Sequence, residues 1–542
     1  MTLQSFVRSK GTLSVTTIVA VVVCYQLFPL SSSRHAIEFD EDGIANKQAY
    51  LAELSERSPS AEDRPNIIIL LADDLGKTDI SHYGGETAQT PNIDAIGEHG
   101  VTFTDAYCTS PICSPSRASM LTGRYQQRFG FETQPLNRYP RNRLEYNVYR
   151  HLMDMGDWRA QKLESVPRRK DMLRQGLPPS EITLSELMQA NDYNTGLIGK
   201  WHLGYTEPFL PTARGFDYSY GFYEAFTLYD AIDDPDIVNH RHDYFASKHI
   251  WAQERNDTCA IRRNEVEIEE DEYLTFAIAR EAIQFMEKNQ SDPFFMFVSF
   301  SAPHTPFQAP KAYYDRFAHV EDQNKRTYYS MIAALDDAVG RVMKSVNDLG
   351  LSDNTLVWFA SDNGGATYTG ATDNAPLKGG KFNHFEGGIN IPCMVQWPGT
   401  IPSGEQMNAP VSLMDIFNTS AAAARIELPP NTDYDGVDLM PQLKGETVIA
   451  PHEALFWRSH HMKAARWQEW KLVVDGRDDR MWLYDLSNDK EEQVNRVADH
   501  PDIVSGMIKR MSEWEASLAP ARWPYLVEYR FTINSETYDY PL

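Results

Sequence analysis

The stretch Asn66-Ile67-Ile68-Ile69-Leu70-Leu71-Ala72, which is followed by Asp73-Asp74, decides the fold class of this chain. It is a continuous apolar run of strand length rather than an alternating one. Both faces of the strand are therefore expected to be buried, as in a parallel sheet. Three later runs have the same character and also end in polar residues, namely 193–199, 294–300 and 355–361. The sequence thus predicts four strands of a parallel sheet.

Helical patterns separate these strands at 182–190, 270–288 and 327–349. Alternating strands and helices predict an α/β fold, with a large and mostly parallel sheet sandwiched by helices. Ligands of such folds bind beyond the carboxyl ends of the strands. The residues expected there can bind a metal or transfer a proton: Asp73, Asp74, Lys200, His202, His304, Asp362 and Asn363. We expect them to converge in one site.

The sequence changes character after about residue 410. Residues 411–424 are predicted to form a helix. Short strand candidates follow at 454–457, 462–467, 470–474 and 481–484. A closing helix is expected at 502–518. We interpret 65–424 as the catalytic α/β domain and 425–542 as a smaller C-terminal α+β subdomain that carries an antiparallel sheet.

The composition of the 542 residues is that of a globular protein with a sizeable core. Its 51 Lys and Arg stand against 76 Asp and Glu, so the net charge is −25. This balance argues against nucleic acid as a partner, because phosphate neutralisation needs a basic face. It does not exclude an anionic substrate, since a local pocket can oppose the global field. The five cysteines are too few and too scattered for a disulfide scaffold.

The N-terminal segment is predicted to be a targeting signal. Arg8 and Lys10 precede an apolar run at 13–30, and small residues follow it. We interpret 1–33 as a secretory signal peptide, with an uncleaved membrane anchor as the alternative. The protein is therefore expected to be exported, either periplasmic or secreted, and to meet a membrane only if this segment is retained. Residues 34–64 are polar and are interpreted as a linker or a surface arm.

The stretch Cys113-Ser114-Pro115-Ser116-Arg117-Ala118-Ser119-Met120-Leu121-Thr122-Gly123-Arg124 resembles the C-x-P-S-R-x-x-x-L-T-G-R signature of formylglycine-dependent sulfatases, without a mismatch at its eight fixed positions. The resemblance extends from Pro65 to about Val497. It is greatest to exported, bacterial-type carbohydrate sulfatases, and it implies an alkaline-phosphatase-like fold. The other matching blocks are 90–94, 199–204, 214–217, 361–364, 377–381 and 386–388. One departure is Asn390, where the family usually has arginine, and we expect it to weaken a structural contact rather than the chemistry.

The resemblance implies that Cys113 is oxidised to formylglycine by a formylglycine-generating maturation enzyme. In the family, one hydroxyl of the hydrated aldehyde attacks sulfur and expels the alcohol. The second hydroxyl then collapses to the aldehyde and releases sulfate, so that one difficult step becomes two easier ones. A thiol cannot perform the second step. The alternative is that Cys113 is an ordinary buried thiol or forms a disulfide with Cys108.

Asp73, Asp74, Asp362 and Asn363 offer hard oxygen ligands, which suit Ca²⁺ or Mg²⁺ better than zinc. The resemblance favours Ca²⁺, with the side chain derived from Cys113 as a further ligand. Such an ion lowers the pKa of a bound hydroxyl and neutralises charge that develops on the sulfate. An aspartate pair after a strand can equally be a helix cap or a solvated turn.

The resemblance also assigns roles to five side chains. Lys200 and Lys381 match the lysines that contact sulfate oxygens. Arg117 matches the arginine that holds the formylglycine. His202 matches the residue that takes a proton from its second hydroxyl, and His304 matches the group that protonates the leaving alcohol.

The substrate is predicted from residues 131–175, which carry ten Lys and Arg against six Asp and Glu. Aromatic residues, among them Trp158, are interleaved with the basic ones. We expect this stretch to bind neighbouring anionic groups of a sulfated glycan, with Arg241 and His242 at the rim of the pocket. The alternative is that these are surface arginines that pair with nearby acids.

Three functions are thus open. The first is hydrolysis of sulfate esters on a sulfated polysaccharide or oligosaccharide. The second is arylsulfatase activity, or phosphonate or phosphate monoester hydrolysis, within the same superfamily. The third is glycan binding by an inactive homologue, which requires an unmodified Cys113. The complete set of ligand-like residues disfavours the third function.

Overall fold

The computed structural model describes residues 21, 23–56, 64–136, 138–154, 156–243, 245–533 and 535–542. Most of the predicted signal peptide at 1–33 therefore lies outside the described residues. Within the described part of the chain, no helix combines the length and apolar character that a membrane span requires.

The core of the molecule is a ten-stranded sheet, and the four predicted strands are its centre. They are β7 (Asn194–Lys200), β12 (Phe294–Pro303), β2 (Asn66–Asp73) and β14 (Thr355–Ser361), adjacent in that order and all parallel. The sheet continues through β8 (Tyr218–Phe222), β10 (Arg262–Arg263) and β11 (Val266–Glu267) on one side, and through β16 (Cys393–Gln396), β3 (Val101–Phe103) and β17 (Glu405–Met407) on the other. The α/β prediction is confirmed.

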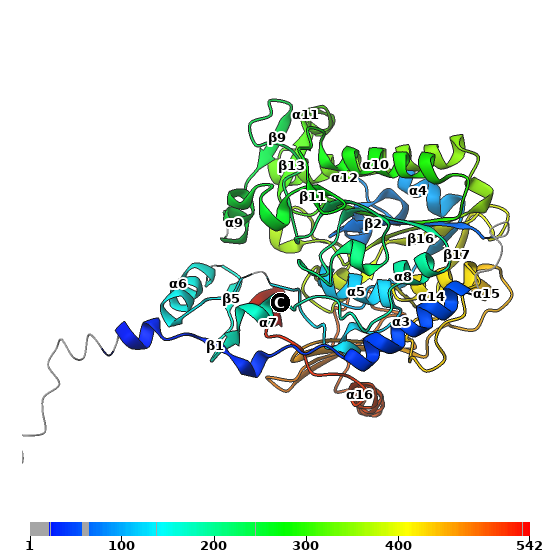
Figure 1. Cartoon of the computed structure of the whole chain (residues 1–542). Coiled ribbons are helices and arrows are strands. Elements are labelled where there is room, and N and C mark those ends of the chain that lie inside the picture. The colour runs from blue at the N-terminus through cyan, green and yellow to red at the C-terminus, as the bar shows by residue number, and fades with distance from the viewer. Residues whose placement is uncertain are drawn as a thin grey trace, which may run out of the picture.

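Helices cover both faces of this sheet, as Figure 1 shows. Along β2, Ile67, Ile69 and Leu71 belong to one core, and Ile68 and Leu70 belong to the other. This explains why the strand has no polar face. The first core contains α5 (Cys113–Thr122), α8 (Leu184–Ala190) and α14 (Asp415–Ala423), while the second contains α4 (Pro91–Glu98), α10 (Leu274–Asn289) and α12 (Gln323–Asp348).

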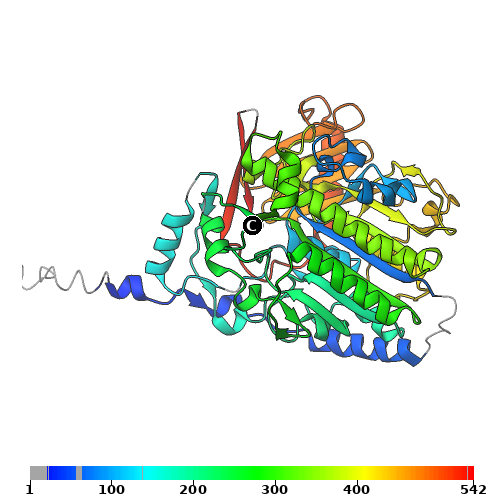
Figure 2. The ribbon, with the colours of Figure 1, turned by 90° about the horizontal axis from the view of Figure 1, so that it is seen from above.

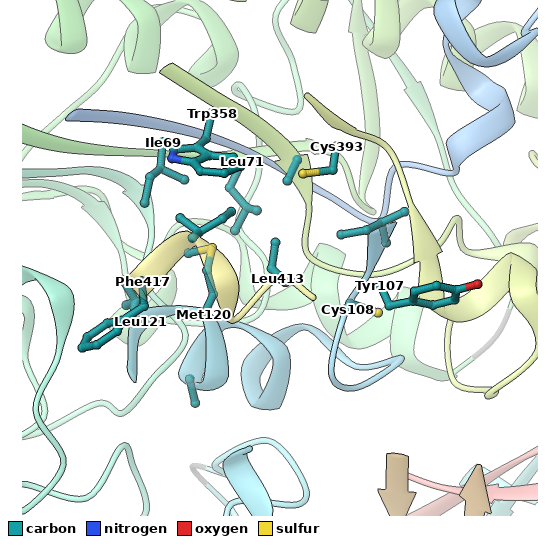
Figure 3. Packing of buried hydrophobic residues seen from close by; sticks show 14 of the residues in the cluster. Ile69, Leu71, Tyr107, Cys108, Met120, Leu121, Trp358, Cys393, Leu413 and Phe417 are labelled. Carbon is teal, nitrogen blue, oxygen red and sulfur yellow. The ribbon is translucent and has the colours of Figure 1, made fainter. Parts of the chain in front are cut away.

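The long helices α10 and α12 lie side by side across one face, as the view in Figure 2 makes clear. On the opposite face, Met120 and Leu121 of α5 pack towards Ile69, Leu71 and Trp358 of the sheet (Figure 3). The helix that begins at Cys113 is thereby fixed against the central strands.

The C-terminal region contains the predicted antiparallel sheet. Its strands are β19 (Ala454–Ser459), β20 (Met462–Trp467), β21 (Trp470–Asp475) and β22 (Arg480–Asp485), and α16 (Pro501–Glu515) packs against them. The prediction of a helix at 411–424 is wrong at its N-terminal end, because helix α14 begins only at Asp415. Val411 and Ser412 form strand β18, which pairs with β4 (Ala106–Tyr107), so tertiary pairing overrides the local helical pattern.

Three segments distant in sequence form a lobe beside the sheet (Figure 1). In the predicted linker at 34–64, residues Glu41–Glu56 form helix α3, which the polar composition did not predict. Helix α3 packs against α8 and is not part of this lobe. Strand pairs join the segments of the lobe. It comprises β1 (Ser31–Ser32), α6 (Arg143–Met153), β5 (Trp158–Ala160), β6 (Val166–Pro167), α7 (Arg169–Met172), β23 (Val527–Ile533) and β24 (Glu536–Pro541). The C-terminal hairpin β23–β24 was not predicted either.

The remaining short elements lie in loops around the sheet. They are β9 (Ile237–His240), α9 (Phe245–Gln253), β13 (Phe307–Pro310), α11 (Lys311–Tyr314), α13 (Glu386–Ile389), β15 (Asn390–Ile391) and α15 (Met440–Leu443).

Candidate active site

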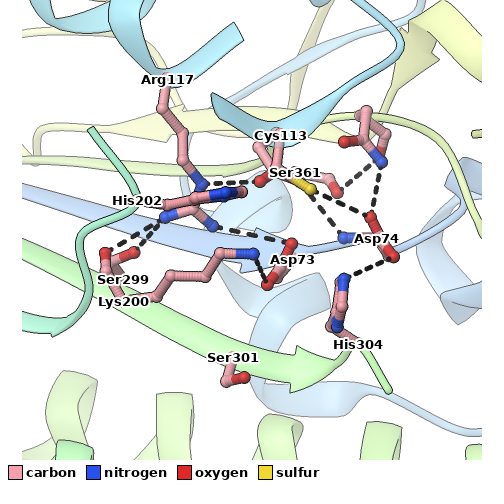
Figure 4. A network of polar contacts seen from close by, with 12 residues as sticks. Asp73, Asp74, Cys113, Arg117, Lys200, His202, Ser299, Ser301, His304 and Ser361 are labelled. Carbon is pink, nitrogen blue, oxygen red and sulfur yellow. Dashed lines mark hydrogen bonds and ion pairs between the residues drawn. The ribbon is translucent and has the colours of Figure 1, made fainter. Parts of the chain in front are cut away.

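The carboxyl ends of the four central strands bring the predicted site residues together (Figure 4). Asp73 and Asp74 come from the end of β2, Lys200 from β7, and His304 follows β12. Asp362 and Asn363 follow β14, and every one of these side chains is buried. The convergence expected from the ends of the strands is therefore present.

Cys113 reaches this cluster from the first position of α5. Its Sγ donates a hydrogen bond to Oδ1 of Asp74 at 3.5 Å. Burial raises the pKa of the Cys113 thiol well above its usual value. Both Cys113 and Cys108 are free, so the alternative of a disulfide between them is not realised here. At the other end of α5, Gly123 adopts φ +65°, and a Cβ there would meet the Phe417 ring at 2.5 Å.

Arg117 lies one helical turn after Cys113 and so projects from the same face of α5. Its Nε donates to Oδ2 of Asp362 at 2.7 Å, and its Nη1 donates to Oγ of Ser299 at 2.6 Å. Burial disfavours the guanidinium charge, but Asp362 and Asp73 outweigh burial and raise the pKa of Arg117. No sequence pattern pointed to Ser299, which helps to fix this arginine.

Two lysine–aspartate pairs hold opposite charges inside the site. Lys200 Nζ lies 2.6 Å from Oδ2 of Asp73, and Lys381 Nζ lies 2.8 Å from Oδ2 of Asp74. Burial opposes the charge on Lys381, yet Asp74 outweighs it, and the pKa of Lys381 is raised well above its usual value. The three buried cations balance three buried carboxylates: Lys200, Lys381 and Arg117 against Asp73, Asp74 and Asp362.

The oxygen atoms at the centre of the cluster fit a hard divalent cation. Oδ1 of Asp73 and Oδ1 of Asn363 are buried and have no hydrogen-bond partner among the described residues. Ligand atoms of Asp73, Asp74, Cys113 and His304 all lie within 4.8 Å of one another. Unsatisfied buried oxygens are costly, and a Ca²⁺ ion would satisfy them. Asp362 accepts from the Asp74 backbone at 3.2 Å as well as from Arg117, so this carboxylate is already oriented.

The two histidines have different surroundings. Nδ1 of His304 lies 2.6 Å from the Thr305 carbonyl oxygen, which can only accept, so Nδ1 carries the hydrogen and Nε2 points towards Asp74. Both ring nitrogens of His202 are buried without a partner within the described part of the chain. Burial and the charge of Lys200 lower the pKa of His202 well below its usual value. His202 is therefore neutral and has a nitrogen able to accept a proton.

Arg241 and His242 are not brought into the cluster. The Arg241 guanidinium stacks 4.6 Å from the Trp251 ring centroid, and His242 Nε2 lies 2.9 Å from Oδ1 of Asn324.

The basic stretch 131–175 reaches the site through an aromatic cluster. The Trp158 ring on β5 lies 5.7 Å from the Phe382 ring, and Tyr368 and Tyr529 complete the group. Phe382 directly follows Lys381, whose Nζ lies 5.3 Å from the Phe382 ring centroid. The role of Tyr529 was missed because it depends on pairing of β5 with the C-terminal strand β23. Four of the ten basic residues pair with acids of the same stretch: Arg138, Arg141, Arg150 and Arg168.

Asn390 bridges two charged side chains next to the site. Its Oδ1 accepts from Lys77 Nζ at 2.8 Å, and its Nδ2 donates to Glu386 Oε2 at 2.9 Å. Arg466 donates to the nearby Asp105 at 3.0 Å and contacts Tyr107. Arg466 of β20 thus places a cation beside Tyr107, the residue that pairs with Asn390, where the sulfatase pattern usually has an arginine.

Comparisons with known proteins agree on one family. The family model described as Sulfatase matches residues 65–426. The N-acetylgalactosamine-6-sulfatase of Sus scrofa is 32% identical over 418 residues, which cover 76% of this chain and 72% of that protein. Arylsulfatase D of Homo sapiens is 30% identical over 475 residues, covering 75% and 73%. The solved structure of Ps i-CgsB in complex with k-i-k-neocarrahexaose has a TM-score of 0.72 and 30% identity, and covers 85% of this chain and 94% of that one.

Proposed function

Because the chain belongs to the sulfatase family, whose members are sulfuric ester hydrolases, we propose that it removes sulfate groups from a sulfated polysaccharide or oligosaccharide. The observation that carries the proposal is the position of Cys113. It begins α5 and faces Asp74 inside a buried cluster of three carboxylates, two lysines and an arginine.

Cys113 is proposed to be converted to formylglycine by a maturation enzyme. Its hydrate would supply one hydroxyl as nucleophile and a second hydroxyl whose deprotonation releases sulfate. The raised pKa of the buried thiol makes an unmodified Cys113 a poor nucleophile, which supports the need for conversion. Arg117, fixed by Asp362 and Ser299, stands one turn away and would orient the modified side chain.

The four oxygen-bearing residues Asp73, Asp74, Asp362 and Asn363 would hold Ca²⁺. The ion would supply two positive charges that lower the pKa of the nucleophilic hydroxyl and polarise the sulfate. The three cations and three carboxylates of the site already cancel. The ion would therefore be balanced by the negative charges of the sulfate ester and of the ionised nucleophile. Lys200 and Lys381 would contact the sulfate oxygens as fixed positive charges.

Proton transfer is assigned to the two histidines. His202 has two unsatisfied ring nitrogens and a lowered pKa, so it would accept the proton from the second hydroxyl. His304 is oriented by the Thr305 carbonyl, so that its Nε2 faces the site. Burial and the charge of Lys381 lower the pKa of His304, whereas Asp74 and Asp73 favour its charged form. In that imidazolium form Nε2 also carries a proton, which it would give to the departing alcohol oxygen.

Two likenesses support a carbohydrate substrate. The i-CgsB structure contains a neocarrahexaose, and a relative of similar identity is named for N-acetylgalactosamine 6-sulfate. In this chain, Trp158 and Tyr368 belong to the aromatic cluster next to Lys381. Aromatic rings present apolar faces on which a sugar ring can pack. We propose that this cluster lines the binding site for the sugar that carries the sulfate.

Two measurements test the function. Peptide mass spectrometry of protein from a host with a maturation system should find formylglycine at position 113. A screen of sulfated glycans, resolved by sulfate position, should find a substrate that is turned over faster than a small aryl sulfate, a phosphate ester or a phosphonate ester. Hydrolysis of a sulfate ester by protein in which Cys113 is present only as the thiol would refute the mechanism. Preference for a phosphate or phosphonate ester would refute the assignment of the substrate.

A further inference from the structure

A second cavity lies outside the buried cluster around Cys113, and its volume is about 310 Å³. Four segments that are distant in sequence line it. They are residues 34–35, residues 161 and 163 after β5, His460 in the turn between β19 and β20, and residues 521–525 before β23. The volume falls in the range of small-molecule binding sites, which is about 300–1,000 Å³. The cavity is therefore large enough for a ligand of its own.

The wall of this cavity is basic, although the chain carries a net charge of −25. Arg34, His35, His460 and Arg522 line it, whereas none of the described residues that line it is Asp or Glu. Arg34 and His35 follow the predicted signal peptide at 1–33 and would remain when that segment is removed. A local basic wall attracts anions even in an acidic protein. The charge of the wall thus indicates an anionic ligand.

Arg34 and Arg522 form no ion pair with a carboxylate in the described part of the chain. The Arg34 side chain is exposed, and Arg522 Nη2 donates a hydrogen bond to the backbone oxygen of Glu38 at 2.7 Å. Burial lowers the pKa of Arg522, and the charges of Glu181 and Asp40 offset this effect only in part. A guanidinium has five N–H donors, so the two arginines can hold the oxygens of a sulfate or carboxylate group.

His460 adds a polar group to the same wall. Its backbone N–H donates to Glu132 Oε2 at 3.0 Å, and its ring centroid lies 4.5 Å from that of Tyr525. Glu132 also accepts from Arg458 and so has a cation of its own. Nε2 of His460 is buried without a hydrogen-bond partner among the described residues. Because unsatisfied buried nitrogens are costly, we expect a ligand in the cavity to satisfy this one.

The remaining wall suits a sugar unit better than an inorganic ion. Leu163, Trp523 and Tyr525 supply apolar surface. Gln161 Nε2 donates to the Tyr525 hydroxyl at 2.8 Å, so polar groups lie beside that surface. Aromatic faces pack against sugar rings, and amide and hydroxyl groups bond to sugar hydroxyls. A water molecule takes up about 30 Å³, so one tetrahedral anion would leave most of this cavity empty.

The cavity lies along the same strand pair as the aromatic cluster beside Lys381. In that cluster, Trp158 of β5 pairs with Tyr529 of β23. Past these residues, Gln161 N donates to the Leu526 oxygen at 2.8 Å, so the two segments stay together up to the cavity. Gln161 lies three residues after Trp158, which is about 10 Å along a strand. A glycan can therefore fill the cavity with one unit while another unit presents its sulfate to Lys381.

We propose that this cavity binds an anionic sugar unit of the glycan, remote from the unit whose sulfate ester is hydrolysed. The inference rests on the proposed function, since it assigns a second contact to the same substrate. Arg34 and Arg522 would pair with the sulfate or carboxylate of that unit, and His460 Nε2 would share a hydrogen bond with one of its oxygens. Because the contact is remote from the ester, it would lower KM for long anionic chains.

Arginine footprinting locates the ligand. The full chain with Cys113→Ala, which cannot form formylglycine, is treated with phenylglyoxal in the presence or absence of a dextran sulfate oligosaccharide. Peptide mass spectrometry then gives the extent of modification of each arginine. Inorganic sulfate at the same sulfate concentration and uncharged dextran are the reference ligands. The matched control is Arg341, an exposed arginine of α12, whose core lies on the other face of the sheet from that of Trp523.

The sulfated oligosaccharide should protect Arg34 and Arg522 and leave the modification of Arg341 unchanged. Neither reference ligand should protect them to the same extent. Equal protection by inorganic sulfate would overturn the proposal in favour of a site for a free anion, and unprotected Arg34 and Arg522 would overturn it outright. Hydrolysis of a sulfate ester by the parent protein, combined with unprotected arginines, would refute this inference and leave the proposed function intact.

A comparison of two substrates that carry the same ester provides the second measurement. In Arg34→Gln combined with Arg522→Gln, the ratio of kcat/KM for a sulfated oligosaccharide to that for a sulfated monosaccharide should fall by about tenfold, the effect of losing one charge-assisted hydrogen bond. Arg34→Gln alone changes an exposed side chain and should lower the ratio even if the double variant does not fold. Arg341→Gln should retain the ratio of the parent. An unchanged ratio in folded Arg34→Gln would contradict the proposed contact.

Discussion

Lys381 donates a hydrogen bond of 2.8 Å from Nζ to Oδ2 of Asp74, whose Oδ1 accepts from Cys113 Sγ at 3.5 Å. One carboxylate therefore joins the residue proposed as the source of the nucleophile to a cation proposed to contact sulfate. The lysine cannot move without leaving a buried charge on Asp74 unpaired. Lys381 and Cys113 are thus held in a fixed relationship by the residue that directly follows β2.

Lys381→Met should reduce kcat/KM for a sulfate ester by roughly 10²–10³-fold, because it removes one preorganised positive charge from the site. Lys344→Met is the matched control, since Lys344 lies on the exposed side of α12. Circular dichroism must show that both variants are folded. Loss of less than tenfold in folded Lys381→Met would contradict a direct contact between this lysine and the sulfate.

His304→Gln should slow substrates with basic leaving alcohols more than substrates with acidic ones. A sugar alkoxide needs a proton to depart, whereas an activated aryl oxide does not. We expect a loss of about 10²–10⁴-fold in kcat for a sugar sulfate and a much smaller loss for a nitrophenyl sulfate. The exposed His319 provides the control His319→Gln. Equal losses on both substrates would mean that His304 positions other groups instead of donating a proton.

Asp73→Asn should abolish the binding of one Ca²⁺ equivalent, as measured by calorimetry on metal-free protein. Binding also stabilises the folded state, by about 2.7 kcal/mol when free Ca²⁺ is one hundred times its Kd. We therefore expect Ca²⁺ to raise the Tm of the unsubstituted protein and to leave that of Asp73→Asn unchanged. Asp348→Asn, at an exposed position of α12, should behave like the parent. A Tm that Ca²⁺ does not alter in the parent would rule out the metal assignment.

Trp158→Ala should raise KM for a sulfated oligosaccharide while kcat/KM for a small aryl sulfate stays nearly constant. Trp158 contacts Tyr368 and Phe382, and Phe382 directly follows Lys381 in the chain. Trp470→Ala on β21 is the control, because it removes a tryptophan outside the aromatic cluster and should leave KM for the oligosaccharide unchanged. If both substrates lose activity equally, the tryptophan supports the fold around Lys381 and does not contact the sugar.

The four central strands and the convergence of their polar ends could be predicted because continuous apolar runs of strand length, separated by helical patterns, favour a sheet that is buried on both faces. The residue at which α14 begins could not be predicted. Val411 pairs with Ala106, which is 305 positions away in the chain, and the local sequence pattern does not indicate such a distant pairing. The same reason explains the missed role of Tyr529, which reaches the site only through pairing with Trp158.

The sequence motifs indicate which charged residues belong to the site, but they do not indicate which of these residues form ion pairs. The motifs contain Lys200 and Asp73, yet only the parallel register of β7, β12 and β2 brings Lys200 Nζ to 2.6 Å from Asp73. Arg241 and His242 were expected at the rim of the pocket. The structure places Arg241 against Trp251 and His242 beside Asn324, and their contact with substrate stays a prediction.

The buried side chain of Lys471 joins the C-terminal antiparallel sheet to helix α13, and we expect it to contribute strongly to stability. Lys471 Nζ on β21 lies 2.8 Å from Glu386 Oε1 and 2.9 Å from Glu492 Oε1, and all three side chains are buried. Lys471→Met leaves the buried Glu386 carboxylate without its cation and Glu492 without its lysine partner, so we expect the free energy of unfolding to fall by about 3–5 kcal/mol. Urea denaturation measures it, with Lys463→Met as the control at a half-buried position of β20.

The same triad predicts how stability depends on pH. Burial is the main cause that raises the pKa of Glu492 from 4.5 to about 7, and the charge of Glu386 adds to it, against the opposing effect of Lys471. The folded state therefore binds a proton that the unfolded state has already released. This favours folding below about pH 4.5 and is lost as the pH rises through about 7. Glu492→Gln should flatten this part of the stability profile, because the amide cannot ionise. A profile between pH 5 and 8 that is identical in Glu492→Gln and the parent would show that Glu492 is ionised throughout, and that Lys471 balances both carboxylates.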